Sequence, residues 1–235
     1  MVKIRIFYDG LDIEKYAKDS RVEGFTTNCS IFGKSPFNSY REFYEANRGA
    51  IGDKPMSLQI WKDAPEEIIE QIDAIHAIDS RIYVKVPIVN TRGEYNEAPI
   101  RHAVKNKIPL NVTAIHTLEQ IKKTKEFLEG SSAPEIISVF GGPISDLYID
   151  PAPFILGAVE QFKGKPNSEI LWAGCRELYT IKRAADMGCH IITIPDAMMD
   201  RLYLLNKTLE ELTIDRVTTF HKDAMKGGFT IGKGL

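Results

Sequence analysis

The chain has 235 residues, of which 43% are hydrophobic and 26% are charged, and its formal net charge is −2 at pH 7. These values are typical of one globular domain of the size of an α/β barrel. The near-neutral charge argues against a general nucleic-acid binder, because neutralising phosphates requires an excess of clustered Lys and Arg.

The sequence also argues against a membrane partner. Its apolar stretches fall far below the about 18 residues that indicate a membrane span. No charged and apolar leader precedes the strand-like segment IRIFY near the start. The three cysteines, Cys29, Cys175 and Cys189, are an odd number without the spacing of a metal site. We therefore expect a cytoplasmic protein without a bound metal.

Short runs of β-branched and aromatic residues alternate with longer segments of helical periodicity along the chain. The predicted strands are, in order, Ile4–Tyr8, Gly24–Thr27, Met56–Trp61, Arg81–Pro87, Pro109–Ala114, Ile136–Phe140, Glu169–Ala173 and His190–Ile194. The amphipathic segments between them include Pro65–Ile78, Leu118–Leu128 and Leu178–Met187. Regular alternation of strand and helix indicates a parallel sheet, and eight such units in this length indicate a (β/α)8 TIM barrel.

The same pattern bears on domain organisation. No internal linker divides the chain, so we predict a single barrel domain over residues 1–235. Ile144–Pro153 is predicted to be an irregular loop. The last residues, about 220–235, are predicted to form a mobile or partner-contacting tail that is Gly-rich from Lys226 onward. An open doubly wound sheet is the alternative fold, but it normally has a Gly-rich first turn, and DGLD is not one.

Polar residues gather at the carboxyl ends of the predicted strands, where a buried polar group is either costly or functional. They are Asp9, Thr27, Asn28, Gln59, Lys85, Asn111, Thr113, Ser138 and Arg176. One such residue means little, because isolated polar groups in a core are often simply hydrogen-bonded. A set at the same end of successive strands predicts a functional site.

Lys85 is the most informative of these residues. It lies between Val84 and Val86 in the centre of a strand. The alternative is a lysine at a solvent-facing strand edge. A barrel strand, however, has helices outside and side chains within, so an ammonium group there is partly desolvated. Desolvation lowers the pKa of a lysine and leaves neutral amine for attack on a carbonyl, which is the requirement for Schiff-base catalysis.

Simpler interpretations exist for the other candidates. Asp9 fits an N-cap or turn aspartate of the following helix, and this is the favoured reading of that residue alone. Thr27 and Asn28 fit turn residues, and Gln59 fits a side chain paired with a backbone group. Cys29 fits a small buried filler to which we assign no chemistry.

Several motifs in order carry a resemblance to a known family. They read GFTTNCS at Gly24–Ser30, YVKVPIV around Lys85, and then NVTAIHTLEQ, IISVFGGPISD and GCHIITIPDAMMDRL. From Ile4 to about Leu205, this series resembles the small transaldolases and fructose-6-phosphate aldolases. The family has a G-[VF]-T-T-N-P-S turn, in which Cys29 replaces the usual Pro, and a [VI]-K-[VI]-P strand with a Schiff-base lysine.

The resemblance implies a role for each matching position. Lys85 would form an imine with a ketose donor, and Asp9 would take the C4-hydroxyl proton as the C3–C4 bond breaks. Gln59 and Thr113 would bind the water that carries protons during imine formation and hydrolysis. The donor would be bound by the remaining matching residues, namely Thr27, Asn28, Asn111, Ser138 and Phe140. No cofactor is implied, and the small members of the family form rings of subunits, which implies a homo-oligomer.

Two departures from the family pattern concern specificity. Transaldolases tend to have Glu and Phe at the positions of Gln59 and Phe140, whereas the aldolases tend to have Gln and Tyr, so this chain has one residue of each set. In addition, Pro143 and Gly174 stand where the family has an Arg and a Ser that bind the distal phosphate. This leaves Arg176 as the remaining phosphate ligand of that motif.

We therefore expect a Schiff-base (class I) transaldolase-like transferase that moves a dihydroxyacetone-type unit between sugars, with an atypical acceptor. Its partners would be small-molecule sugar or sugar-phosphate substrates. The first alternative is a lyase, an aldolase that releases free dihydroxyacetone or a related ketone. The second is a catalytically silent sugar-binding barrel, which the presence of both Lys85 and Asp9 disfavours.

Overall fold

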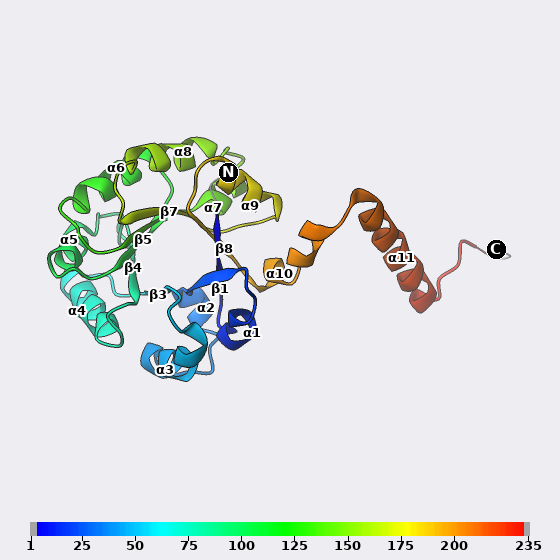
Figure 1. Ribbon diagram of the computed structural model, residues 1–235, viewed down its shortest axis with the longest axis horizontal. Helices are drawn as coiled ribbons and strands as arrows, with labels where there is room; N and C mark the ends of the chain where they lie inside the picture. Colours follow the sequence, from blue (N-terminus) through cyan, green and yellow to red (C-terminus); the bar gives the residue numbers. More distant parts are fainter. Residues whose placement is uncertain (1–3, 233–235) are drawn as a thin grey trace. The chain divides into compact units, whose positions relative to one another are not determined.

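The computed structural model describes residues 4–232 and contains two compact units, residues 4–199 and 200–232 (Figure 1). The first unit is a closed barrel in which neighbouring strands are parallel and follow the order of the chain. Its strands are β1 Arg5–Asp9, β2 Val22–Thr26, β3 Met56–Gln59, β4 Tyr83–Pro87, β5 Leu110–Ile115, β6 Glu135–Val139, β7 Ser168–Trp172 and β8 Ile191–Ile194. Its helices are α1 Ile13–Ala17, α2 Cys29–Phe32, α3 Tyr40–Ile51, α4 Pro65–His76, α5 Glu97–Lys105, α6 Leu118–Phe127, α7 Gly141–Asp146, α8 Ala152–Gln161, α9 Tyr179–Asp186 and α10 Asp196–Met199. The predicted (β/α)8 barrel is confirmed.

Local sequence accounts for the boundaries of these elements. Each of the eight strands begins and ends within two residues of its predicted position. Helix α4 starts with Pro65, whose fixed φ suits a first helical turn. Helix α6 starts with a capping box, in which Thr117 and Gln120 satisfy each other's backbone N–H groups.

The loop predicted over Ile144–Pro153 is wrong at both ends. Helix α7 runs through Asp146, and α8 begins at Ala152 with Pro153 in its first turn. Proline is tolerated there because the first N–H groups of a helix have no partner within the helix. Only the segment 147–151 between the two helices is irregular.

Apolar side chains from strands on different sides of the barrel fill its interior. The buried cluster comprises Phe7, Ile136, Leu171, Ala173 and Ile191, with Tyr83 and Phe140 packed against it. Phe7 on β1 also reaches β2, where a Cβ atom at Gly24 would lie 2.5 Å from the Phe7 ring. This packing leaves the carboxyl ends of the strands for polar side chains.

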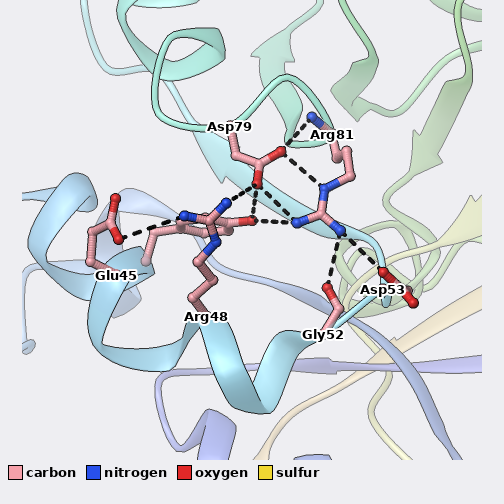
Figure 2. Close-up of polar contacts among 7 residues, drawn as sticks. Glu45, Arg48, Gly52, Asp53, Asp79 and Arg81 are labelled. Atoms are coloured by element: carbon pink, nitrogen blue, oxygen red, sulfur yellow. Dashed lines mark hydrogen bonds and ion pairs between the residues drawn. The ribbon is translucent and has the colours of Figure 1, made fainter.

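An ion-pair network joins α3 to the loop before β4, at the opposite end of the barrel (Figure 2). The carboxylate of Asp79 accepts hydrogen bonds of 2.9 Å from the Arg81 guanidinium and 2.8 Å from the Tyr44 hydroxyl. Arg48 approaches the same carboxylate at 3.7 Å, and Arg81 also reaches Asp53 at 3.3 Å. The hydrogen bond from Arg81 is the main cause of a pKa of Asp79 well below its usual range.

The second unit contains η1 Leu202–Asn206 and the helix α11 Leu209–Gly227. A capping box of Thr208 and Glu211 starts α11, and Gly228 ends it in the left-handed conformation. No residue of α11 is buried. The predicted tail therefore begins within this helix, and its residues 233–235 lie outside the described residues. Across residues 4–232, no helix has the length and apolar character that a membrane crossing requires.

Candidate active site

Lys85 lies in the middle of β4 with its side chain inside the barrel. It pairs in register with Gln59 on β3 and Asn111 on β5. The residue is only 5% exposed, and its Nζ donates a hydrogen bond of 3.4 Å to the main-chain oxygen of Thr27. Burial lowers the pKa of the Lys85 ammonium group, and Asp9 and then Cys29 partly offset this effect. Burial therefore makes the neutral, nucleophilic amine easier to form than it is for an exposed lysine.

Asp9 ends β1 and is half-buried. Its Oδ1 accepts a hydrogen bond of 2.7 Å from the hydroxyl of Thr26, its partner in register on β2. The N-cap of α1 is Asp12, so the cap position of that helix does not belong to Asp9. Because its charge acts on Lys85, the Asp9 carboxylate lies within electrostatic reach of the amine.

A chain of hydrogen bonds crosses three strands beside Lys85. The Ser138 hydroxyl on β6 donates to Asn111 Oδ1 at 2.7 Å, and Asn111 Nδ2 on β5 donates to Ser57 Oγ on β3 at 3.1 Å. All three side chains are buried. These bonds fix the rotamer of Asn111, because both ends of its carboxamide are held.

Threonine hydroxyls add unpaired polar atoms to this region. Thr113 follows Asn111 on the same face of β5 and is 1% exposed. The hydroxyls of Thr27 and Thr113 are buried, and neither forms a hydrogen bond with another described residue. A buried hydroxyl without a protein partner is available to bind water or substrate.

Gln59 and Cys29 lie against each other at the end of β3. Gln59 Nε2 is 3.6 Å from Cys29 Sγ, which in turn is 3.6 Å from the main-chain oxygen of Ile60. Cys29 also lines a cavity of about 580 Å³, together with residues of α3 and α4 and with Trp61. Cys29 thus separates an outer cavity from the site around Lys85.

Asn28 and Phe140 have structural contacts as well as positions near the site. Asn28 is the N-cap of α2, and its Oδ1 accepts a hydrogen bond of 3.0 Å from the Ile31 N–H. The turn role considered for this residue is therefore present, and its side-chain N–H groups remain for other contacts. Phe140 packs against the interior cluster and lies 5.3 Å from the His116 ring, measured between ring centroids.

Arg176 lies at the rim of the barrel and not in the buried group. Its guanidinium forms an ion pair of 2.6 Å with Asp146, the last residue of α7. Both side chains are about half exposed, at 56% and 54%. The loops that carry these two residues follow neighbouring strands, β6 and β7.

A second cavity, of about 770 Å³, borders Asp9 on the β1 side of the rim. Its lining includes the ends of the loops after β1, β2 and β8, and it contains Lys34. Among residues 4–232, no group of three or more His, Cys, Asp and Glu side chains is placed to hold a metal ion.

Three contributors to this site were not among the sequence candidates. Thr26 holds Asp9, Ser57 holds Asn111, and Cys29 contacts Gln59. Ser57 lies two residues before Gln59, and strand alternation alone places both on the interior face. Asp146 gave no signal, because its partner Arg176 lies 30 residues away in the sequence.

Comparison with known proteins adds to the geometry. The model of the transaldolase/fructose-6-phosphate aldolase family matches residues 6–231. A probable transaldolase of Thermoanaerobacter sp. (strain X514) is 26% identical, over 97% of this chain and 100% of that protein. A probable transaldolase of Streptococcus agalactiae serotype V is 28% identical, over 94% of this chain and 97% of that protein.

Solved structures agree on the architecture. An HpcH/HpaI aldolase from Desulfitobacterium hafniense DCB-2 superposes with a TM-score of 0.56 at 11% identity, over 93% of each chain. At that identity the similarity concerns the barrel fold alone. The family model, in contrast, matches the sequence itself over residues 6–231, so it establishes family membership and not only the fold. This chain belongs to the transaldolase/fructose-6-phosphate aldolase family.

Proposed function

We propose that this protein is a Schiff-base enzyme that transfers a dihydroxyacetone-type unit from a ketose donor to an aldehyde acceptor. The observation that carries the proposal is a lysine buried inside the barrel, on β4, with a carboxylate on β1 within electrostatic reach. Family membership supports aldolase or transaldolase chemistry in general.

In the first half of the proposed reaction, neutral Lys85 Nζ attacks the donor ketone, and water leaves as the imine forms. Asp9 then takes the proton of the C4 hydroxyl while the C3–C4 bond breaks. The electron pair of that bond moves into the protonated imine, giving an enamine, and the first aldehyde departs. The hydrogen bond from Thr26 keeps the Asp9 carboxylate oriented for this step.

In the second half, the enamine attacks the carbonyl carbon of the acceptor aldehyde, and Asp9 returns its proton to the carbonyl oxygen. Water then hydrolyses the imine and frees Lys85. Gln59 and Thr113 orient this water; an amide cannot transfer the proton itself at neutral pH. The unpaired Thr113 hydroxyl supports that role.

The donor hydroxyls have a prepared set of partners in this proposal. Asn111 and Ser138 are held in place by their mutual hydrogen bond, so substrate binding does not have to order them. Asn28 offers its side-chain N–H groups, because its oxygen already caps α2. Thr27 and Phe140 complete the donor end.

A lyase is the second candidate, and Gln59 is the residue that favours it. Release of free dihydroxyacetone requires water to reach the imine before an acceptor does. Phe140 has no hydroxyl to activate that water, and it packs against the His116 ring. This combination supports transfer over release.

We also propose that the functional form is a homo-oligomer. Leu209, Leu212, Val217 and Phe220 of α11 are exposed and lie on one face at helical spacing. An apolar stripe of this kind fits burial against another copy of the chain.

Borohydride trapping tests the proposed chemistry directly. Incubation with a ketose such as fructose and borohydride should add a three-carbon, dihydroxyacetone-derived mass to the peptide that contains Lys85. Lys85→Met should abolish both the adduct and turnover, while a surface control such as Lys163→Met should retain both. An adduct on another residue, or turnover by Lys85→Met, would exclude the Schiff-base assignment.

A further inference from the structure

We infer that the acceptor of this enzyme is an uncharged polyhydroxylated aldehyde that carries no phosphate. This inference rests on the proposed function and specifies its second substrate. It follows from the charges and the packing at the rim of the barrel, on both sides of the site.

On the β6–β7 side, the available cation is already neutralised. Arg176 is bound to Asp146 at 2.6 Å, so a phosphate that used this guanidinium would have to displace a carboxylate or lie beside it. An exposed ion pair is weak and can open. The Asp146 charge nevertheless stays within a few ångströms and repels a dianion, which reduces what the arginine can contribute.

The two loops on this side are also closed against each other. A Cβ atom at Gly142 would lie 1.6 Å from the main-chain oxygen of Gly174. Gly174 has a φ of +74°, and a Cβ atom there would lie 2.7 Å from Pro143 Cδ. No side chain fits at either glycine without separating the loops, so neither position can supply a hydroxyl or a cation to an anion.

On the β1 side, carboxylates outnumber cations. The 770 Å³ cavity beside Asp9 is also lined by the carboxylates of Asp12, Glu14 and Asp196. Its one lysine is Lys34, which is exposed and makes no ion pair with any residue in 4–232. Four carboxylates and one ammonium group disfavour a dianion there, whereas carboxylates are good acceptors for sugar hydroxyls.

Cations of the loops after β3 and β4 are engaged as well. Lys62 forms an ion pair of 2.7 Å with Glu67, and Arg92 binds Asp63 and Glu94 at 2.9 and 2.8 Å. Phosphate binding in proteins normally uses several cationic or N–H donors together. On these sides of the barrel, Lys62, Arg92 and Arg176 are already paired with carboxylates, and Lys34 is outnumbered by them.

The first test compares two acceptors that differ only in the phosphate. With fructose or dihydroxyacetone as donor, the wild-type protein is supplied with erythrose or erythrose 4-phosphate, and the seven-carbon product is measured by mass spectrometry. We expect kcat/KM for erythrose to be at least tenfold higher. Equal or higher efficiency with erythrose 4-phosphate overturns the inference.

The second test removes the carboxylate that neutralises Arg176. Asp146→Asn should raise the ratio of kcat/KM for erythrose 4-phosphate to that for erythrose by about tenfold, since it frees one charge-assisted hydrogen bond. The matched control is Asp150→Asn, which breaks the ion pair of the same loop with Arg183 and should leave the ratio unchanged. A ratio that moves equally in both variants, or in neither, contradicts the role given to Asp146.

Failure of this inference is distinguishable from failure of the proposed function. Borohydride trapping with fructose alone reports on Lys85 without any acceptor. Trapping together with a preference for erythrose 4-phosphate would overturn the uncharged acceptor and leave the Schiff-base chemistry intact. Absence of trapping would overturn both.

Discussion

The side-chain nitrogen of Lys85 lies 3.4 Å from the main-chain oxygen of Thr27, and no described carboxylate forms an ion pair with it. A neutral carbonyl compensates a buried charge less well than a carboxylate does. This explains why burial dominates the pKa of Lys85 and lowers it. Two measurable consequences follow for this residue, one kinetic and one thermodynamic.

The kinetic consequence concerns imine formation. The rate of trapping with fructose and borohydride should rise with pH. It should level off below the ordinary pKa of lysine, which is about 10.4 in model peptides. A rise that continues to that ordinary value would mean that Lys85 is not desolvated in the working enzyme. The measurement is the initial rate of trapping from about pH 6 to about pH 11, so that the range includes the ordinary lysine pKa, with protein integrity checked at each pH.

The thermodynamic consequence concerns stability. The folded pKa of Lys85 lies below its unfolded value, so the unfolded chain binds more protons between the two, and stability rises with pH across that window. Lys85→Met removes the penalty and should be more stable than wild type at pH 7, by about 1.4 kcal/mol for each unit of pKa lowering. The difference should shrink as the pH approaches the unfolded value. Equal denaturation midpoints at pH 7 would contradict this expectation.

Replacement of Asp9 should separate imine formation from bond cleavage. Asp9→Asn keeps the size of the side chain and can still accept the hydrogen bond from Thr26, but it cannot take a proton. Trapping of an intact donor should persist while cleavage falls by roughly 100-fold or more. Asp186→Asn, which loses only an exposed ion pair with Lys182 at the end of α9, is the matched control and should cleave at the wild-type rate. Near wild-type cleavage by Asp9→Asn would remove Asp9 from the chemistry.

The pair Gln59 and Phe140 should set the balance between transfer and release. Phe140→Tyr places a hydroxyl beside the site and should raise the yield of free dihydroxyacetone relative to transfer product. Gln59→Glu should shift the balance toward transfer. Product analysis with and without an acceptor aldehyde measures the ratio. Identical ratios in both variants and wild type would show that these two positions do not control water access.

The network around Asp79 predicts acid sensitivity (Figure 2). Asp79→Asn should lower the free energy of unfolding by about 1–2 kcal/mol at pH 7, because Arg81 and Tyr44 lose a charged partner. The pKa of Asp79 is lower in the folded protein than in the unfolded chain, where it is about 3.9. Its contribution to the free energy of unfolding is therefore fully present above that unfolded pKa, and it is lost as the pH falls toward the folded pKa. Asp53→Asn, which alters a fully exposed partner of Arg81, should change little. Urea denaturation at pH 7 and pH 3 distinguishes the two.

Assembly can be tested on α11. Light scattering should give a mass well above the 26.5 kDa of one chain. Phe220→Glu introduces a charge into the apolar stripe and should lower the assembled mass, whereas Lys222→Glu, on the charged side of the helix with Asp215 and Lys226, should not. A stable wild-type monomer at micromolar concentration would end the proposal.

The sequence was sufficient for the barrel because its evidence is local. Runs such as IRIFY and YVKVPIV mark strands by their β-branched content, and their alternation with amphipathic helices limits the fold to a few possibilities. The ends of α7 and α8 were misjudged because Gly, Pro and Asp residues indicate loops equally well as helix termini. Similarly, the irregularity of β5 at Ala114, with a φ of +59°, has no signal in the sequence.

The candidate site was predictable to the extent that strand ends converge. Lys85, Asn111 and Ser138 were expected at the carboxyl ends of their strands. The structure does bring them together, since Asn111 is in register with Lys85 and accepts a hydrogen bond from Ser138. Lys85, however, lies in the middle of β4, and Asn111 lies near the start of β5. Hydrogen bonds between distant segments were not predictable, since no local pattern connects Ser57 to Asn111 or Asp146 to Arg176. The first contact holds Asn111 in place for the donor, and the second neutralises Arg176 at the rim. Both depend on how segments far apart in the sequence pack together.

The three thiols of the chain differ in a way that is of practical use. Cys175 and Cys189 are buried, and burial raises the pKa of both, that of Cys189 to about 12. Cys29 is half-buried and lines the outer cavity, while its sulfur touches Gln59. A maleimide fluorophore should therefore label Cys29 selectively in the native protein. The natural sequence thus provides a spectroscopic reporter beside the site, through which donor binding can be followed without introducing a cysteine.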